Sequence, residues 1–402
     1  MRILRPDDAE YEAVRRPALP NYWHVRPSAV VRCFSTADVV STLEYARTAG
    51  LHVTPRGGGH CFAGRSSTSG VVLDLSPLNS VSVSGGVAVV GAGAVLDQVY
   101  SGLDAHGLTL PAGCGPTVGI AGLTLGGGLG LLGRRYGLTC DRLLSAEVVL
   151  TDGRVVTSSV DSEPDLFWAL RGAGGGQFGV VTSLVFAPVP ASPAIRFLLT
   201  WPVAAAFDVV LVWQEVAPDA PDEVSANLKI TVFGVTVFGA GPPPDELLRL
   251  TPSTRDITTM PYRHLKESFD GPETGPITSK SEFFAENLPT PTIKTLLDAL
   301  TPGCELNFTP MGGAYNRIPP HATAFAHRHT RFLLEHTAPT PTQAHTSWTI
   351  THPHGTGRVY PNFPDPTLPN WQTAYHAENH PRLAEIKAHY DSDRVLHFKQ
   401  SL

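Results

Sequence analysis

Glycine is concentrated in the first half of this chain, and this uneven distribution limits what the chain can fold into. Of its 38 glycines, 28 lie between Gly50 and Gly179, whereas 27 of its 36 prolines come after Gly179. Glycine allows tight turns and close backbone approach, and proline interrupts helices and strands. The sequence therefore predicts two units of different structure that meet near Pro188 and Pro190.

Three glycine clusters dominate the first unit: Pro55–His60, Pro111–Gly130 and Gly172–Gly179. Backbone N–H groups that have no side chains beside them can converge on an anion, and a flat cofactor can then approach the main chain. One such cluster could equally be a set of turns. Three of them in one half of the chain favour a binding site for a cofactor that carries phosphate.

Two stretches match the spacing of a dinucleotide-binding fingerprint, Gly174–Gly179 and Gly128–Gly133. The first follows a segment of helical character, Asp165–Arg171, and precedes an apolar strand, Val180–Phe186, which reverses the order that a Rossmann site requires. The second has no clear strand before it. The sequence also contains neither a lysine-bearing phosphate loop nor a kinase signature. We therefore reject both stretches as nicotinamide sites, and nucleotide hydrolysis has no support in the sequence.

Composition narrows the class further. The chain has 402 residues, of which 42% are hydrophobic and 16% charged, and its net charge is -6 at pH 7. These values predict a large core, argue against disorder and against a broad nucleic-acid face, and favour a small-molecule partner. No apolar run is long enough to span a membrane and the start lacks a signal-peptide core, so we expect no membrane partner and a cytoplasmic location. The five cysteines include no Cys-x-x-Cys pair, so neither a disulfide framework nor a metal site is expected.

Periodicity predicts the principal elements. A strand over 29–34 precedes a helix that Ser35 or Thr36 can cap and that Gly50 can end. Asp152-Gly153 predicts a hairpin with a type I′ turn. In the second half, apolar and polar residues alternate over 224–232, which indicates an antiparallel sheet with one polar or ligand-facing side. An amphipathic helix is expected near the end of the chain.

Several ordered motifs together carry a family resemblance. They are Arg56–His60, Val71–Leu75, Pro116–Gly128, Asp165–Gly172 and Gly179–Thr182 in the first half, and Met311–Arg317, Thr323–Arg328, Tyr360–Asp365, Arg382-Leu383, Tyr390-Asp391 and Gln400-Ser401 in the second. With these motifs the chain resembles the FAD-linked oxidases of the berberine bridge enzyme-like branch of the vanillyl-alcohol oxidase superfamily.

The resemblance implies an α+β fold with three parts. Residues 1–190 are expected to form a PCMH-type FAD-binding domain of two subdomains. Residues 191–358 are expected to form a substrate-binding domain, an antiparallel sheet with flanking helices. Residues 359–402 are expected to return to the FAD domain.

The resemblance also implies FAD as the cofactor. The residues expected to bind it are Arg56, Gly57, Gly58, Gly59, His60, Gly64, Ser66, Cys114, Gly115, Pro116, Thr117, Gly119, Ile120, Gly122, Leu123, Gly127, Gly128, Gly130, Gly176, Gly179, Val180, Tyr360 and Asn362. His60 occupies the position at which the family attaches FAD through the 8α-methyl. Some relatives add a thioether to a cysteine directly before Pro-Thr-Val-Gly, but Gly115 holds that place here and Cys114 precedes it. We therefore expect a single link, through His60.

The catalytic base is the point at which this sequence departs from the family. Relatives commonly have Tyr-x-Asn-Tyr, in which the first tyrosine and the asparagine line the flavin and the last tyrosine deprotonates the substrate. This chain has Tyr360-Pro361-Asn362-Phe363. Tyr315, in a stretch expected to form a strand facing the flavin, is the candidate replacement, and a packing role for it stays open. Tyr315 and Tyr360 are therefore the residues predicted to be catalytic.

The resulting expectation is an oxidase. Hydride would pass from an alcohol, phenol-linked or amine carbon of a small molecule to FAD, and dioxygen would reoxidise the cofactor to give hydrogen peroxide. Two alternatives stay open, a dehydrogenase with another electron acceptor and a flavin-containing protein that binds a ligand without turnover.

Overall fold

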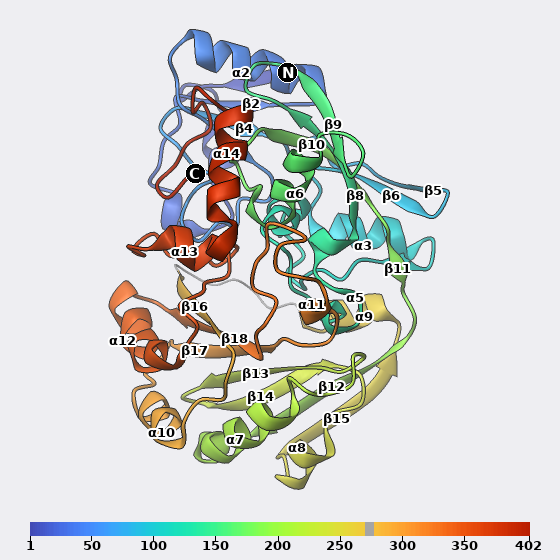
Figure 1. Cartoon of the computed structure of the whole chain (residues 1–402), viewed down its shortest axis with the longest axis vertical. Coiled ribbons are helices and arrows are strands. Elements are labelled where there is room, and N and C mark those ends of the chain that lie inside the picture. Colours follow the sequence, from blue (N-terminus) through green and yellow to red (C-terminus); the bar gives the residue numbers. More distant parts are fainter. Residues whose placement is uncertain (270–276) are drawn as a thin grey trace.

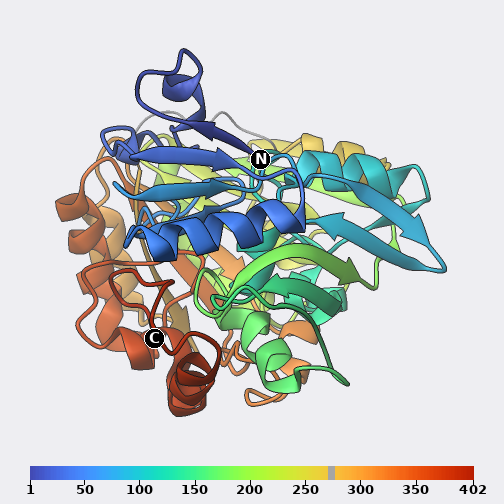
Figure 2. The ribbon, with the colours of Figure 1, turned by 90° about the horizontal axis from the view of Figure 1, so that it is seen from above.

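The computed structural model describes residues 1–269 and 277–402 and shows the glycine-rich half built on two sheets (Figures 1 and 2). The first sheet has the strand order β1-β2-β4-β3. Strands β2 (Ala29–Arg32), β4 (Val71–Asp74) and β3 (Val53–Arg56) are parallel, and β1 (Arg2–Leu4) pairs with β2 in the antiparallel sense.

Helix α2 (Thr36–Thr48) confirms the helix predicted after the first of these parallel strands. The Ser35 hydroxyl accepts a hydrogen bond from the Asp38 N–H at 3.2 Å, and Gly50 follows the helix with a φ of +62°. The buried face of α2 packs against β4 and against the second sheet, so that the helix lies between the two sheets (Figure 2).

The second sheet is antiparallel throughout, in the order β5-β6-β10-β8-β9. Its strands are β5 (Val81–Ser84), β6 (Val87–Gly91), β10 (Val180–Phe186), β8 (Leu143–Val149) and β9 (Val155–Ser159). The remaining elements of this half are α1 (Tyr11–Val14), α3 (Leu96–Asp104), α4 (Ile120–Leu125), α5 (Gly133–Tyr136), α6 (Pro164–Ala173) and the short pair β7 (Leu108–Thr109) and β11 (Val189–Pro190).

The hairpin predicted at Asp152-Gly153 joins β8 to β9, but the predicted type I′ turn is wrong. A type I′ turn needs a positive φ at both central residues, and only Gly153 has one, at +93°. The Leu150 N–H instead donates to the Arg154 carbonyl at 2.8 Å, which closes a longer loop.

The second half forms a seven-stranded antiparallel sheet in the order β15-β12-β14-β13-β17-β18-β16. Its strands are β12 (Ala194–Trp201), β13 (Ser225–Thr231), β14 (Gly234–Ala240), β15 (Thr254–Met260), β16 (Thr278–Phe284), β17 (Glu305–Pro310) and β18 (Phe332–Ala338). Strand β13 confirms the strand predicted from alternation, since Ala226, Leu228 and Ile230 are buried on one of its faces.

Helices cover that apolar face of the sheet. They are α7 (Ala206–Val216), α8 (Asp245–Arg249), α10 (Thr290–Asp298) and α12 (Pro341–Thr351), with α7, α8 and α10 on the side away from the glycine-rich half (Figure 1). Trp213 of α7 packs edge-on against Phe308 and Phe332 of the sheet. The opposite face of the sheet, which carries Phe283 and Leu333, is turned toward the glycine-rich half.

The end of the chain returns to the first half, through α13 (Trp371–His376) and α14 (His380–Tyr390) (Figure 1). Leu383 and Ile386 of α14 join the same apolar core as α6 and the first two sheets. The arrangement is the α+β fold that the sequence predicts, with two sheets in the first half and a separate antiparallel sheet in the second. Among the described helices, none combines the length and the apolar character that a membrane span requires.

Candidate active site

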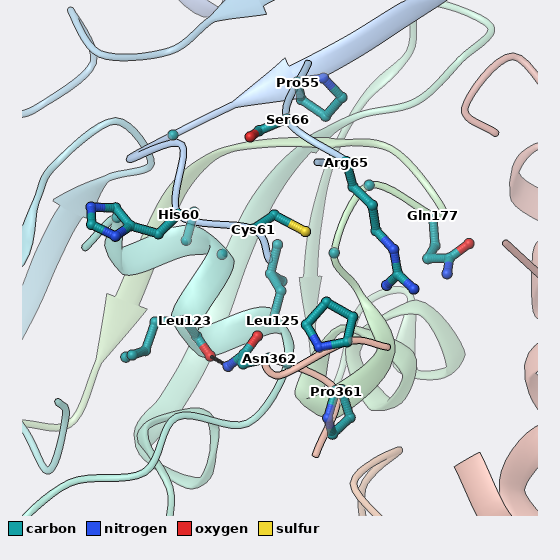
Figure 3. Close-up of a pocket in the computed structure, with 18 of the residues that line it drawn as sticks. Pro55, His60, Cys61, Arg65, Ser66, Leu123, Leu125, Gln177, Pro361 and Asn362 are labelled. Atoms are coloured by element: carbon teal, nitrogen blue, oxygen red, sulfur yellow. Dashed lines mark hydrogen bonds between the residues drawn. The ribbon is translucent and has the colours of Figure 1, made fainter. Parts of the chain in front are cut away.

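A cavity of about 480 Å³ lies where the three glycine clusters and the C-terminal segment meet (Figure 3). This volume falls in the range of small-molecule and cofactor sites. Many of the predicted site residues line it: Gly57, Gly58, Gly59, His60, Ser66, Gly115, Gly119, Gly122, Leu123, Gly176, Gly179, Val180, Tyr360 and Asn362. His60 lies at one end of the cavity, and Arg65 and Gln177 lie at the other (Figure 3).

The other predicted residues do not line this cavity. They are Arg56, Gly64, Cys114, Pro116, Thr117, Ile120, Gly127, Gly128, Gly130 and Tyr315. Several of these glycines instead permit close packing behind the wall. A Cβ on Gly130 would stand 2.1 Å from the Ala112 carbonyl oxygen, and one on Gly64 would stand 2.4 Å from the ring of Tyr22.

The side chain of Arg56 points away from the cavity. Its buried guanidinium donates to the carbonyls of Arg15 at 2.8 Å and Val14 at 2.5 Å, at the C-terminal end of helix α1. Burial lowers the pKa of Arg56, while the nearby Asp74 carboxylate opposes that shift. Arg56 therefore ties the glycine loop to the N-terminal segment and offers no charge to a ligand in the cavity.

Two lining glycines show that the cavity is shaped for a ligand close to the main chain. A Cβ added to Gly122 or to Gly175 would meet no atom within 4 Å. A side chain at either position would therefore project into the cavity and fill part of it. Bare backbone of this kind suits a flat ring system and a diphosphate.

Arg65 supplies positive charge on the cavity wall. Its guanidinium carbon lies 4.5 Å from the centre of the Phe398 ring, and Nη2 donates to Oε1 of Gln400 at 3.2 Å. The Nε atom is buried and has no hydrogen-bond partner among the described residues. A buried donor without a partner is costly, so the cavity favours an anionic ligand here. The wall therefore fits the phosphates of FAD.

His60 and Cys61 line the cavity, whereas Cys114 does not. His60 lines it, and Nε2 of His60 lies 3.0 Å from the Thr117 hydroxyl. Cys114 does not line it and packs against the cluster that contains Tyr262 and Leu265, with Sγ 3.9 Å from Nζ of Lys266. Cys61, which the sequence analysis did not select, does line the cavity.

Tyr360, Asn362 and Phe363 form one wall. The Tyr360 hydroxyl accepts hydrogen bonds from the N–H groups of Gly128 and Leu129, at 3.0 and 3.2 Å, and from Nδ2 of Asn362 at 3.0 Å. Burial nevertheless raises the pKa of Tyr360 to about 12, against the opposing effect of these donors. The phenol is therefore neutral at physiological pH and serves as a fixed acceptor.

The strand predicted around Tyr315 is wrong, because this residue lies in the helical turn α11 (Ala314–Arg317). Its buried hydroxyl donates to the Gly130 carbonyl at 2.9 Å and accepts from the Gly130 N–H at 3.1 Å. Burial raises the pKa of Tyr315. The structure therefore places the candidate base behind the cavity wall, as a packing residue.

The C-terminal segment contributes lining residues that the sequence analysis missed, among them Leu396, His397, Phe398 and Gln400. A buried lysine of α14, Lys387, holds this segment in place. Its ammonium donates to the carbonyls of Gln177 at 2.5 Å and Leu396 at 2.6 Å and pairs with Asp391 at 2.5 Å. The i, i+4 spacing of Lys387 and Asp391 was a signal in the sequence, but it does not reveal the distant partners.

Glu335 of β18 is a second residue that the sequence analysis missed. It lies on the sheet face turned toward Tyr360, because Leu333, two residues earlier on the same face, packs in one cluster with Tyr360. Oε1 of Glu335 accepts from the Ser279 hydroxyl at 2.7 Å. Burial, reinforced by the carboxylate of Glu305, raises the pKa of Glu335 to about 7.

Metal chemistry has no evident site in the part of the chain that the structure describes, where no three His, Cys, Asp or Glu residues are grouped to hold an ion. Two buried histidines are in packing positions. His336 lies 3.0 Å from the Ser347 hydroxyl, and His327 stacks on Phe283.

Comparison with known proteins gives the same picture. A family model described as an FAD binding domain matches residues 27–159, and one described as berberine and berberine like matches residues 359–402. The chain is 32% identical to the uncharacterized FAD-linked oxidoreductase YgaK of Bacillus subtilis, over 100% of this chain and 96% of that protein. It is 39% identical to (R)-6-hydroxynicotine oxidase of Paenarthrobacter nicotinovorans, over 45% of this chain and 40% of that enzyme.

A solved structure agrees along the whole chain. Berberine bridge enzyme-like protein 1 of Physcomitrella patens superposes with a TM-score of 0.93 at 26% identity, covering 100% of this chain and 96% of that one.

Proposed function

Because the chain belongs to the berberine bridge enzyme-like family of FAD-linked oxidoreductases, we propose that it is an FAD-dependent oxidase of a small molecule. The substrate would give up a hydride from an alcohol, phenol-linked or amine carbon. Dioxygen would take the two electrons and become hydrogen peroxide. The relative named hydroxynicotine oxidase supports an oxidase within this family.

The observation that carries the proposal is the position of the cavity. It is lined by bare glycine backbone and by Tyr360 and Asn362, and Tyr360 packs in one cluster with Phe283 and Leu333 of the seven-stranded sheet. Bound FAD would supply a two-electron acceptor at this wall. A cofactor in the cavity and a substrate on the sheet face would therefore meet.

We assign the holding of FAD to the lining residues of the three glycine clusters, with Arg65 as a phosphate partner. His60 would form the only covalent link, because the Cys114 side chain packs away from the cavity. The Thr117 hydroxyl would orient the imidazole for this bond. Tyr360 and Asn362 would fix the ring system rather than move a proton.

Access of dioxygen is proposed at Gly119–Gly122, where Gly119, Ala121 and Gly122 line the cavity. Small side chains at this position leave room for a diatomic molecule.

The sheet order also supports the proposed division of the chain into 1–190, 191–358 and 359–402. Cytoplasmic location stays a prediction from the sequence.

The test is the mass and the colour of the purified protein. We expect a yellow protein whose polypeptide mass exceeds the sequence mass by one FAD, and a His60→Ala variant that releases its flavin on denaturation. Flavin that stays attached to the variant would refute the single link. A colourless protein that takes up no added flavin would refute the proposed function.

Two measurements separate the alternatives. Anaerobic photoreduction tests whether the flavin cycles at all, and a flavin that cannot be reduced would favour a ligand-binding protein. Stopped-flow mixing of the reduced protein with air then tests the acceptor. Fast reoxidation with peroxide release is expected of the oxidase, whereas slow reoxidation would favour a dehydrogenase.

A further inference from the structure

A buried ion pair joins the two halves of the chain behind the cavity wall. Asp141 belongs to the 3-10 turn η2 (Thr139–Arg142) of the first half, and Arg328 lies between α11 and β18 of the second half. Nη2 of Arg328 donates to Oδ1 of Asp141 at 2.7 Å, and Nη1 donates to Oδ2 at 2.9 Å, so the contact is bidentate. The two side chains are 0% and 3% exposed. The pair therefore fixes turn η2 to the second half, away from solvent.

Turn η2 holds the segment Gly127–Leu129, which lies next to it. The Thr139 N–H donates to the Gly128 carbonyl at 3.0 Å, and the next N–H, of Cys140, donates to the preceding carbonyl at 2.9 Å. The approach is close, since a Cβ on Gly128 would stand 2.3 Å from the Thr139 hydroxyl oxygen. A displacement of η2 would therefore move this segment through two backbone hydrogen bonds.

The same segment binds Tyr360 on its other side. The N–H groups of Gly128 and Leu129 donate to the Tyr360 hydroxyl, at 3.0 and 3.2 Å, and Tyr360 lines the cavity. A peptide unit is planar, and in the trans form its carbonyl and its N–H point in opposite directions. Two consecutive peptide units thus bridge η2 and the phenol, because each accepts from the turn through its carbonyl and donates to the hydroxyl through its N–H.

Arg328 also contacts the apolar surroundings of the phenol. Its guanidinium carbon lies 5.0 Å from the centre of the Phe325 ring. The Phe325 ring in turn lies edge-on to the Tyr360 ring, with centroids 6.2 Å apart. One arginine therefore supports both the hydrogen-bonded end and the ring of Tyr360.

We propose that Asp141 and Arg328 are positioning residues for the flavin, and that they act through Tyr360. The ion pair fixes η2, η2 fixes two peptide units, and these units hold the phenol oxygen at the cavity wall. Neither Asp141 nor Arg328 lines the cavity, so they have no contact of their own with a bound cofactor. The inference rests on one part of the proposed function, the binding of FAD in this cavity.

The experiment measures the flavin itself. Arg328→Gln and Asp141→Asn are purified with their flavin, and the absorption band is compared with that of the unmodified protein. The ratio of oxidised to reduced flavin is then measured at equilibrium with a reference dye. We expect both variants to shift the band in the same direction as Tyr360→Phe. The ratio should change about fivefold, which corresponds to the loss of one hydrogen bond. Asp141→Asn differs little in shape from the original, so it serves as the second test if Arg328→Gln does not fold.

A double variant tests the route of the effect. If the ion pair acts through the phenol, Arg328→Gln combined with Tyr360→Phe should have the band and the ratio of Tyr360→Phe alone, because no hydroxyl is left to be misplaced. Residues that act as one unit give non-additive effects of this kind. Additive changes in the double variant would overturn the proposal.

Arg134→Gln is the matched control. Arg134 is also buried, and from helix α5 it donates to the carbonyls of Pro218 and Ala220 in the second half. The midpoint of denaturant unfolding should therefore fall as it does in Arg328→Gln, while the band and the ratio stay unchanged. An equal band shift in Arg134→Gln, or an unshifted band in Arg328→Gln and Asp141→Asn, would show a purely structural role and overturn the proposal. A protein that holds no flavin would instead overturn the proposed function.

Discussion

The backbones of Gly58 and Gly119 are in direct contact beside the cofactor cavity. A Cβ added to Gly58 would stand 2.3 Å from the Gly119 nitrogen, and a Cβ added to Gly119 would stand 2.3 Å from the Gly58 nitrogen. Both residues line the cavity. The first and second glycine clusters can therefore form a continuous wall only because neither position has a side chain.

Gly58→Ala should separate these two loops. The new methyl would collide with backbone, which cannot rotate away as a side chain can. We expect the free energy of unfolding to fall by about 1 to 3 kcal/mol, as in other overpacked sites. Flavin content after purification should fall as well. Denaturant unfolding and the absorbance ratio of flavin to protein measure the two effects.

Gly122→Ala is the matched control for that substitution, because its methyl would meet no atom within 4 Å. Gly122 lies within helix α4, where alanine is favoured over glycine by up to about 1 kcal/mol. The variant should therefore be at least as stable as the unmodified chain, and yet hold less FAD, since the methyl occupies cofactor space. Normal flavin content in Gly122→Ala would contradict the proposed position of the cofactor.

Thr117→Val should slow the attachment of FAD to the protein. The substitution removes the hydroxyl that lies 3.0 Å from Nε2 of His60, while it keeps the shape of the side chain. Loss of one orienting hydrogen bond should reduce the rate about five- to tenfold. The measurement adds FAD to flavin-free protein and follows the fraction that stays with acid-precipitated polypeptide. Thr117→Ser retains the hydroxyl and should attach FAD at nearly the normal rate.

The parts of the site that could be predicted from the sequence are those with a local cause. A glycine cluster shows directly where the backbone must turn tightly or approach another chain segment. The sequence therefore predicted most of the cavity wall in Pro55–His60 and around Gly119. The same holds for the Ser35 cap of α2 and for the alternating strand β13.

The site features that the sequence did not predict depend on contacts between distant parts of the chain. Strand β18 is buried on both faces at Phe332, Leu333 and Leu334, so no alternation in the sequence shows which side Glu335 faces. Leu396 to Gln400 reach the cavity through contacts with distant parts of the chain, among them the hydrogen bonds of Lys387 to the Gln177 and Leu396 carbonyls. Tyr315 was placed in a strand, but Gly312 and Gly313, with φ of +86° and +53°, end the strand before it.

Lys387→Met tests how the C-terminal segment is held. The substitution leaves Asp391 buried without its cation and removes donors to the carbonyls of Gln177 and Leu396. Breaking a buried pair in this way should cost about 3 to 5 kcal/mol of unfolding free energy. Limited proteolysis should then cut near the end of the chain.

Arg154→Ala is the control for Lys387→Met. Arg154 pairs with Asp152 on the surface, and both side chains are largely exposed. Its loss should leave the unfolding free energy within experimental error, because solvent screens exposed pairs. Equal destabilisation by the two substitutions would show that burial of the lysine is unimportant.

The pH dependence of stability should report the ionisation of Glu335. Its pKa is raised from 4.5 to about 7 in the folded state, so the folded protein binds the proton more tightly than the unfolded chain. The resulting stabilisation is complete below pH 4.5 and is lost as pH rises through about 7. Glu335→Gln has no such proton. Its stability relative to the unmodified protein should therefore increase between these pH values, and a constant difference would contradict the shift.

Tyr315→Phe and Tyr360→Phe separate packing from contact with the cofactor. Removing the Tyr315 hydroxyl leaves the Gly130 N–H without its partner, although the Gly130 carbonyl still accepts from the Gly133 N–H, and should cost about 1 to 3 kcal/mol of unfolding free energy. Flavin reduction by a substrate should change little, because this hydroxyl lies behind the cavity wall. Removing the Tyr360 hydroxyl frees donors at the wall itself, from Gly128, Leu129 and Asn362, and should alter the flavin absorption band. A different result would show that Tyr315 acts as the base. In that case Tyr315→Phe would slow anaerobic flavin reduction about a hundredfold or more at unchanged stability, which is the rate loss expected when a general base is removed. Tyr315 would then have to reach the substrate.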